Sequence, residues 1–204
     1  MGLQRNLNES AKNGASIWRL NMKESLRDKT RDDLTFALNA AGVGSEMSDR
    51  GRVEEKVENS WYQRSLGVID ISEGAIKWIN ILKKDRSDKS PPKWWVVMGI
   101  PDDGVALNTE QIKIKTKRKK SFPLFGKVIG VTWKGKDGST GLAKTLSDDL
   151  STDEVAARVG NLEIKSQIEH FRGWTLTVDR KVNLTNMDWE AFKKIADYIL
   201  RSPR

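Results

Sequence analysis

The chain has 204 residues and a net charge of +8, a length sufficient for one domain with a sizeable core. It has no cysteine and a single histidine, which excludes disulfides, thiolate metal sites and imidazole-rich metal sites. No apolar run approaches the length of a transmembrane helix and no signal-peptide core opens the chain, so we expect a soluble, cytoplasmic protein.

The first 60 residues divide into a tail and a helical extension. Residues 1–16 are rich in Asn, Ser, Gly and Lys without hydrophobic periodicity, which predicts a mobile tail. Residues 17–60 show helical patterns with modest apolar faces, so we expect helices that lean on the following domain or on a partner. That domain is expected to occupy residues 61–204.

Local signals place two helices in the better marked part of this extension. Thr30 begins a capping-box pattern that predicts a helix start, and glycine 42 ends the apolar stripe that follows. Residues 42–51 have the composition of a loop. Val53, Val57 and Trp61 follow at four-residue spacing, which predicts a further short helix with these side chains on its apolar face.

After residue 62 the patterns favour strands. Alternating or continuous apolar runs bounded by turns predict about seven strands, a helical insertion in two pieces between residues 140 and 160, and a final helix capped by Thr185. The short connections predict an α+β fold with a mostly antiparallel sheet or partly open barrel and a C-terminal capping helix. In its number of elements this outline resembles pleckstrin-homology-like barrels. The predicted strands cover residues 67–72, 75–82, 94–100, 112–120, 128–133, 162–169 and 174–179.

Positive charge is concentrated in the middle of the chain. Residues 61–138 hold 16 Lys and Arg against 8 Asp and Glu, whereas residues 1–60 and 139–204 each hold 10 against 10. The densest run is Ile-Lys-Ile-Lys-Thr-Lys-Arg-Lys-Lys at residues 112–120. Because side chains of a strand alternate between faces, this run predicts one apolar face and one basic face. The basic face carries Lys113, Lys115, Lys117 and Lys119.

Such a row of ammonium groups requires an anion or a facing row of carboxylates. Lys127 and Lys134 would border the row if the neighbouring strands pair as expected. Nucleic acid, an anionic lipid surface and an acidic protein are the candidate partners. Protection of an edge strand by lysines is the structural alternative. Aromatic side chains that could stack on bases or insert into lipid are Phe122, Phe125 and Trp94.

One short motif permits an enzymatic hypothesis. Glu163-Ile164-Lys165, on a predicted strand, resembles the acid-x-Lys element of restriction-endonuclease-like nucleases. That resemblance implies a Mg²⁺ site completed by an upstream carboxylate, with the lysine stabilising the attacking water. The upstream carboxylates at a suitable distance along the chain are Asp148, Asp149 and Asp153.

No other catalytic pattern stands out. The P-loop and dinucleotide-binding fingerprints are absent, and His170 precedes a predicted turn where a solvent-facing histidine is ordinary. We therefore expect no cofactor and favour a non-enzymatic binding or adaptor module that uses its basic strand face. A nuclease and a purely protein-interacting subunit are the alternative hypotheses.

Overall fold

The computed structural model of the chain describes residues 28–105, 110–122 and 126–202. The predicted tail and Phe125 therefore lie outside the described residues. The elements within these ranges are α2 (Thr30–Ala40), β1 (Ser45–Met47), the 3-10 helix η1 (Val53–Lys56), β2 (Arg64–Ile71), β3 (Trp78–Lys84), β4 (Lys93–Pro101), β5 (Lys113–Lys120), β6 (Val128–Lys136), α3 (Leu142–Ser147), α4 (Leu150–Val159), β7 (Leu162–Ile168), β8 (Phe171–Val178) and α5 (Asn186–Arg201).

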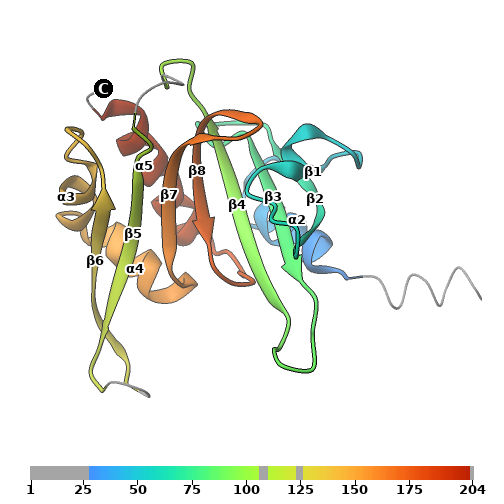
Figure 1. Cartoon of the computed structure of the whole chain (residues 1–204), viewed down its shortest axis with the longest axis horizontal. Coiled ribbons are helices and arrows are strands. Elements are labelled where there is room, and N and C mark those ends of the chain that lie inside the picture. Colours follow the sequence, from blue (N-terminus) through green and yellow to red (C-terminus); the bar gives the residue numbers. More distant parts are fainter. Residues whose placement is uncertain (1–27, 106–109, 123–125, 203–204) are drawn as a thin grey trace, which may run out of the picture.

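The strands form one open antiparallel sheet in the order β1-β2-β3-β4-β8-β7-β5-β6 (Figure 1). With its N-terminal helix, helical insertion and C-terminal helix, the chain has the predicted α+β fold. The sheet has eight strands rather than about seven. The additional strand is β1, which pairs with β2 and lies in the segment 42–51 that was expected to be a loop. A strand of three residues is too short to leave an alternating pattern in the sequence.

Two local predictions for the N-terminal part are wrong. Thr30 does not cap α2, because its own N–H and hydroxyl donate to the Asp28 carboxylate at 3.0 and 2.6 Å. The helix expected over residues 53–61 is only the single turn η1. Of its expected apolar stripe only Val57 is buried, whereas the side chain of Trp61 is 95% exposed.

One face of the sheet is covered by helices, which lie behind the strands in Figure 1. Alternate strand residues such as Met98, Ile164 and Leu176 point into the core between the sheet and α3, α4 and α5. The start of α5 is as predicted: Thr185 Oγ1 accepts from the N–H of Asp188, and the Asp188 carboxylate accepts from the N–H of Thr185. Among the described residues, no helix combines the length and apolarity needed to cross a bilayer.

The opposite face carries a smaller apolar cluster and a loop that runs over the sheet. We call residues 48–63, which connect β1 to β2 and include η1, the crossing loop. Val57 of this loop is buried against Trp78, Leu82 and Val97, which lie on the side of β3 and β4 away from the helices. The crossing loop therefore covers part of this face and reaches β7 through the ion pair between Glu58 and Lys165, whereas β5 and β6 follow β7 in the strand order.

Phe192 of α5 allows a test of the hydrophobic core, because its side chain is fully buried. We expect Phe192→Ala to lower the free energy of unfolding by about 3–5 kcal/mol, because the substitution leaves a cavity in the core. Urea unfolding followed by circular dichroism measures this change. The control is Phe36→Ala, since Phe36 is 77% exposed on α2 and its removal should change stability by less than about 0.5 kcal/mol. Equal effects of the two substitutions would contradict the described core.

Candidate anion-binding face

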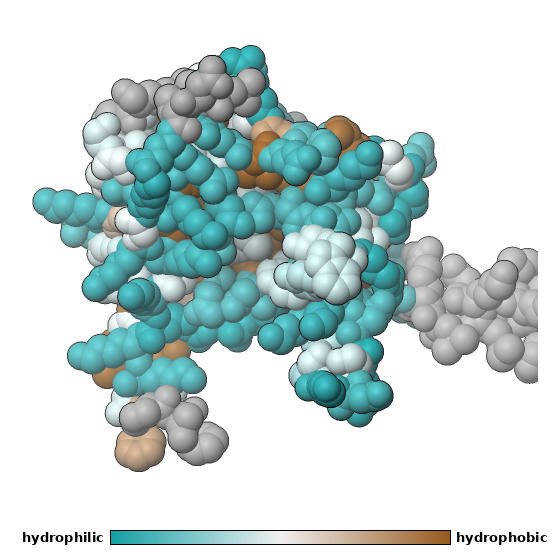
Figure 2. Space-filling view, viewed as in Figure 1, coloured by the Kyte–Doolittle hydropathy of each residue, from teal (hydrophilic) through white to brown (hydrophobic). Residues whose placement is uncertain are grey.

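The basic residues of β5 lie on the face opposite to the helices. Ile114 and Thr116 are buried on the core side, and the lysines that alternate with them are exposed. The segment is therefore extended with one apolar and one basic face, as its alternation predicted. Figure 2, viewed in the direction of Figure 1, shows hydrophilic side chains over most of this face.

Strand β6 adds lysines directly beside those of β5. Lys136 pairs with Lys113, and Lys134 pairs with Lys115, so like charges stand opposite one another across the two strands. Lys113 is flanked on its other side by Lys165 of β7. Directly opposed like charges destabilise a sheet unless an anion lies between or above them. We define the lysine face as Lys113, Lys115, Lys117, Lys119, Lys134 and Lys136.

Two carboxylates neutralise part of the lysine face. Glu163 of β7 lies 3.4 Å from Lys113 Nζ and 3.1 Å from Lys115 Nζ, and Glu110 pairs with Lys136. The Glu163 contacts could not be predicted from the sequence, because they depend on the register between β5 and β7. Across the part of the chain that the structure describes, Lys117, Lys119 and Lys134 form no ion pair. The lysine face therefore keeps an excess of positive charge.

Lys165 joins this face to the crossing loop. Its ammonium lies 2.5 Å from Glu58 Oε2 in the loop and 3.4 Å from Glu163 Oε1. Burial acts to lower the pKa of Lys165, but the two carboxylates raise that pKa above its ordinary value. Burial likewise acts to raise the pKa of Glu163, but Lys165 and Lys115 hold that pKa below its ordinary value. Lys165 and Glu163 are therefore both charged at neutral pH.

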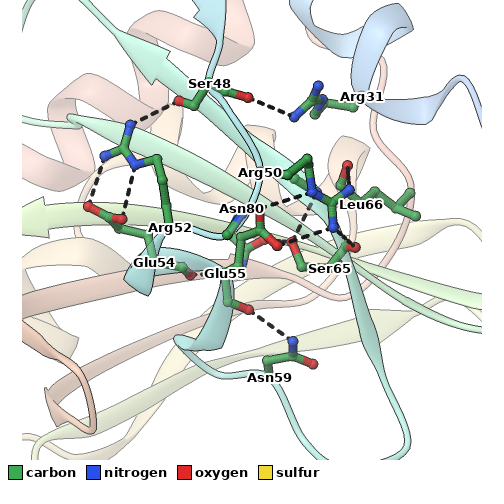
Figure 3. Close-up of polar contacts among 12 residues, drawn as sticks. Arg31, Ser48, Arg50, Arg52, Glu54, Glu55, Asn59, Ser65, Leu66 and Asn80 are labelled. Atoms are coloured by element: carbon green, nitrogen blue, oxygen red, sulfur yellow. Dashed lines mark hydrogen bonds and ion pairs between the residues drawn. The ribbon is translucent and has the colours of Figure 1, made fainter.

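The crossing loop is fastened to the sheet by polar contacts (Figure 3). Arg50 forms an ion pair with Glu55 and donates to the backbone oxygen of Leu66 at 2.8 Å. Asn80, buried in β3, donates through Nδ2 to the backbone oxygen of Glu54 at 2.9 Å. These contacts hold the loop in one position over the sheet, since breaking them would leave buried polar groups unpaired.

A polar groove of about 320 Å³ lies between the crossing loop and the lysine face. We call it the loop groove. Two of its lining residues, Glu58 and Gln167, have positive φ angles of 58° and 53°, a backbone conformation that is uncommon outside glycine. The loop contributes Lys56, Asn59 and Ser60 to the lining, and the sheet side contributes Gln111, Lys113 and Lys165.

The far end of the β5–β6 pair extends beyond its neighbour. Pairing of β5 with β7 ends at Lys115 and Glu163, whereas pairing with β6 continues to Lys120 and Val128. Figure 1 shows this end of the hairpin beyond the end of β7. Lys127 lies at this end, next to the turn, where its backbone oxygen accepts from the N–H of Ser121. Lys117, Lys119 and Lys120 are exposed in this part of the hairpin.

Phe122 and Trp94, two of the aromatic residues predicted to contact a ligand, lie in different parts of the structure. Phe122 is exposed at the end of the β5–β6 hairpin. Trp94 packs against the helix-side core with Lys83 over its ring at 5.3 Å, so it does not border the lysine face. The exposed aromatic side chain that the sequence analysis missed is Trp61, which was assigned to a helix stripe. Its polar neighbours Asn59 and Ser60 were the available sign of a turn.

The residues of the nuclease hypothesis lie on two faces of the sheet. Glu163 and Lys165 alternate with core residues of β7 and face away from the helices. Asp149 caps α4 on the helix side and accepts from Tyr198 at 2.6 Å and from Lys194 at 2.5 Å. Asp148 and Asp153 belong to the same helical insertion. Within the described ranges no group of three or more Asp, Glu or His side chains could hold a metal ion.

A pH experiment tests the ion pairs of Glu163. Because the folded-state pKa of Glu163 is lowered, its stabilisation is fully present above the ordinary carboxylate pKa and is lost as pH falls through the folded-state value. We expect Glu163→Gln to cost about 1 kcal/mol at neutral pH. The difference from the parent in urea unfolding should shrink as the pH falls below the ordinary carboxylate pKa. A difference that stays constant as the pH falls would contradict the ion pairs.

Comparisons with known proteins do not assign the chain to a family. No protein-family model, no curated protein and no solved structure matches it. The function is therefore inferred from the geometry and the charge of the lysine face and of the groove beside it.

Proposed function

We propose that this protein binds nucleic acid through the lysine face, by contacts with phosphates. The observation that carries this proposal is the direct opposition of Lys113 to Lys136 and of Lys115 to Lys134 on an exposed sheet face. Opposed ammonium groups raise the energy of the folded chain unless an anion lies on them. Glu163 and Glu110 supply less charge than this face requires.

The spacing of the lysines suits a regularly charged chain. Neighbouring lysines on one face of β5 are about 6.7 Å apart, and the row from Lys113 to Lys119 is about 20 Å long. A ligand whose negative charges repeat along its length can contact several of these ammonium groups at once. Nucleic acid has this property, and its phosphates account for most non-specific affinity in protein–nucleic acid complexes.

Protection of a sheet edge explains the lysines of β5 poorly. Lysines protect a strand that has a free edge, but β5 pairs with β6 on one side and with β7 on the other over Lys113 to Lys115. The edge strand of the order is β6. The first half of the β5 row therefore lies within the sheet, where lysines have no such protective role.

An anionic lipid surface is the second candidate, and one observation favours it. Phe122 and Ile129 are exposed near the end of the β5–β6 hairpin, where apolar side chains could enter the interfacial region of a membrane. Lys119 is the residue of the lysine face nearest to these apolar side chains, whereas Lys113 and Lys136 lie at the other end of the paired strands. We therefore give priority to nucleic acid.

The direct test replaces Lys113, Lys115, Lys117 and Lys119 by glutamine together. We expect the parent to bind a labelled oligonucleotide at low salt, with log K falling linearly as log salt concentration rises. The quadruple variant should bind at least tenfold more weakly. The slope of log K against log salt concentration should be smaller in magnitude by about 3 units, because binding releases fewer counterions when fewer phosphates are contacted. Fluorescence anisotropy at several salt concentrations measures both quantities.

A charge-matched control separates this surface from net charge. The control variant replaces the exposed Lys29, Lys77 and Lys144 and the partly buried Lys193 by glutamine, and none of these residues belongs to the lysine face. It should retain nearly the parent affinity and slope. Equal weakening of both variants, or absence of oligonucleotide binding at low salt, would refute the proposal. Binding to anionic vesicles but not to the oligonucleotide would favour the lipid candidate.

A substitution in the opposite direction gives a second test. Glu163→Gln removes the carboxylate that neutralises Lys113 and Lys115. We expect the variant to bind the same oligonucleotide about two- to fivefold more tightly at low salt, because two more ammonium groups become available to phosphates. High salt should abolish the gain. Unchanged or weaker affinity, with folding confirmed by circular dichroism, would count against contact between phosphates and these lysines.

A further inference from the structure

We infer that the ligand is single-stranded nucleic acid, with one base in the loop groove and another stacked on Trp61. This inference rests on the proposed function and adds the strand type and two contacts with bases. Phosphate contacts alone do not distinguish a single strand from a duplex. The distinction comes from groups that could contact only bases that are not stacked inside a double helix.

The loop groove borders the lysine face directly. Lys113 lines the groove and also pairs with Lys136, so a phosphate held by these two lysines would have its base next to the groove. A volume of about 320 Å³ lies at the small end of the range for ligand pockets, which suits a flat fragment better than a large molecule. The groove is therefore placed and sized for one base.

The polar groups of the groove match the edges of bases. Gln111 Nε2 donates to the backbone oxygen of Ser166 at 3.1 Å, which fixes the amide, and its Oε1 forms no hydrogen bond with the described residues. Asn59 also lines the groove, but its Nδ2 donates to the backbone oxygen of Glu55 at 2.9 Å and its Oδ1 is buried beneath the surface, so Gln111 is the amide that a base could contact. Amide side chains are common partners of base edges.

The backbone beside the groove has an uncommon conformation on both sides. Glu58 in the crossing loop and Gln167 at the end of β7 both have positive φ. Such conformations cost free energy outside glycine and occur preferentially at ligand sites. Glu58 is held there by its ion pair with Lys165 and its hydrogen bond with Thr175. The energetic cost of this turn is consistent with a groove maintained for a ligand.

Trp61 follows the groove residue Ser60 immediately in the chain. Its side chain is 95% exposed, and Tyr62 contacts it edge-on with ring centroids 5.6 Å apart. An exposed indole offers a large flat surface on which an unpaired base can stack, and this stacking tolerates any base. The bases of a duplex are already stacked on one another and cannot use this surface. Trp61 would therefore favour single strands.

The experiment compares a labelled single-stranded oligonucleotide of mixed sequence with its annealed duplex at low salt. Trp61→Ala should weaken binding of the single strand about tenfold and leave binding of the duplex nearly unchanged. Trp61→Phe should restore much of the loss, because phenylalanine also stacks. Gln111→Leu should weaken single-strand binding about fivefold. The control Phe36→Ala removes another exposed aromatic residue, on α2, and should change neither affinity.

The outcomes separate this inference from the proposed function. Lys113→Gln should weaken binding of both forms, because it removes a phosphate contact common to them. Equal affinity for single strand and duplex, with Trp61→Ala and Gln111→Leu without effect, overturns the inference and leaves the lysine face as a non-selective site. Loss of single-strand binding in Phe36→Ala also overturns it. Absence of binding to either form at low salt overturns both proposals.

Discussion

The alternation of side chains across one antiparallel sheet is the constraint on which this molecule depends. In β5 a step of one residue separates Ile114, which is completely buried, from lysines that are exposed. A shift of register by one residue would place ammonium groups in the core and isoleucine in water, so the apolar half of the strand fixes the position of the basic half. The helices on one face therefore determine where the charge lies on the other.

Much of the fold could be predicted because its elements leave local signals. The strand β5 was predicted from alternation alone, and α5 was predicted from the capping box of Thr185. The crossing loop could not be predicted in the same way. Trp61 stands at helical spacing from Val57, but a turn with positive φ at Glu58 and an ion pair to Lys165, 107 residues away in the chain, direct the loop instead. Local patterns carry no information about contacts of that kind.

The candidate site shows the same division. The lysines of β5 and their exposure followed from the sequence, whereas the facing lysines of β6 and the proximity of Glu163 depend on strand register. The contact between Lys165 and Glu58 places the groove beside the lysine face. Neither residue lies in a sequence pattern that would have predicted this contact. Of the aromatic residues expected at the site, Trp94 packs toward the helices instead. Whether an aromatic side chain is buried depends on which elements pack over it, and the sequence of one strand does not show which elements cover its faces.

The even spacing of the lysines has a consequence for motion of a bound chain. Ammonium groups on flexible stems follow one another at about 6.7 Å along β5, so a phosphate chain displaced by one interval would again meet ammonium groups, although Glu163 neutralises those of Lys113 and Lys115. If the proposed function holds, the energy would change in small steps from one alignment to the next, and a bound strand would shift lengthwise along β5 without dissociating. A fixed alignment would need a feature that occurs once, and the turn at Glu58 is such a feature on this face.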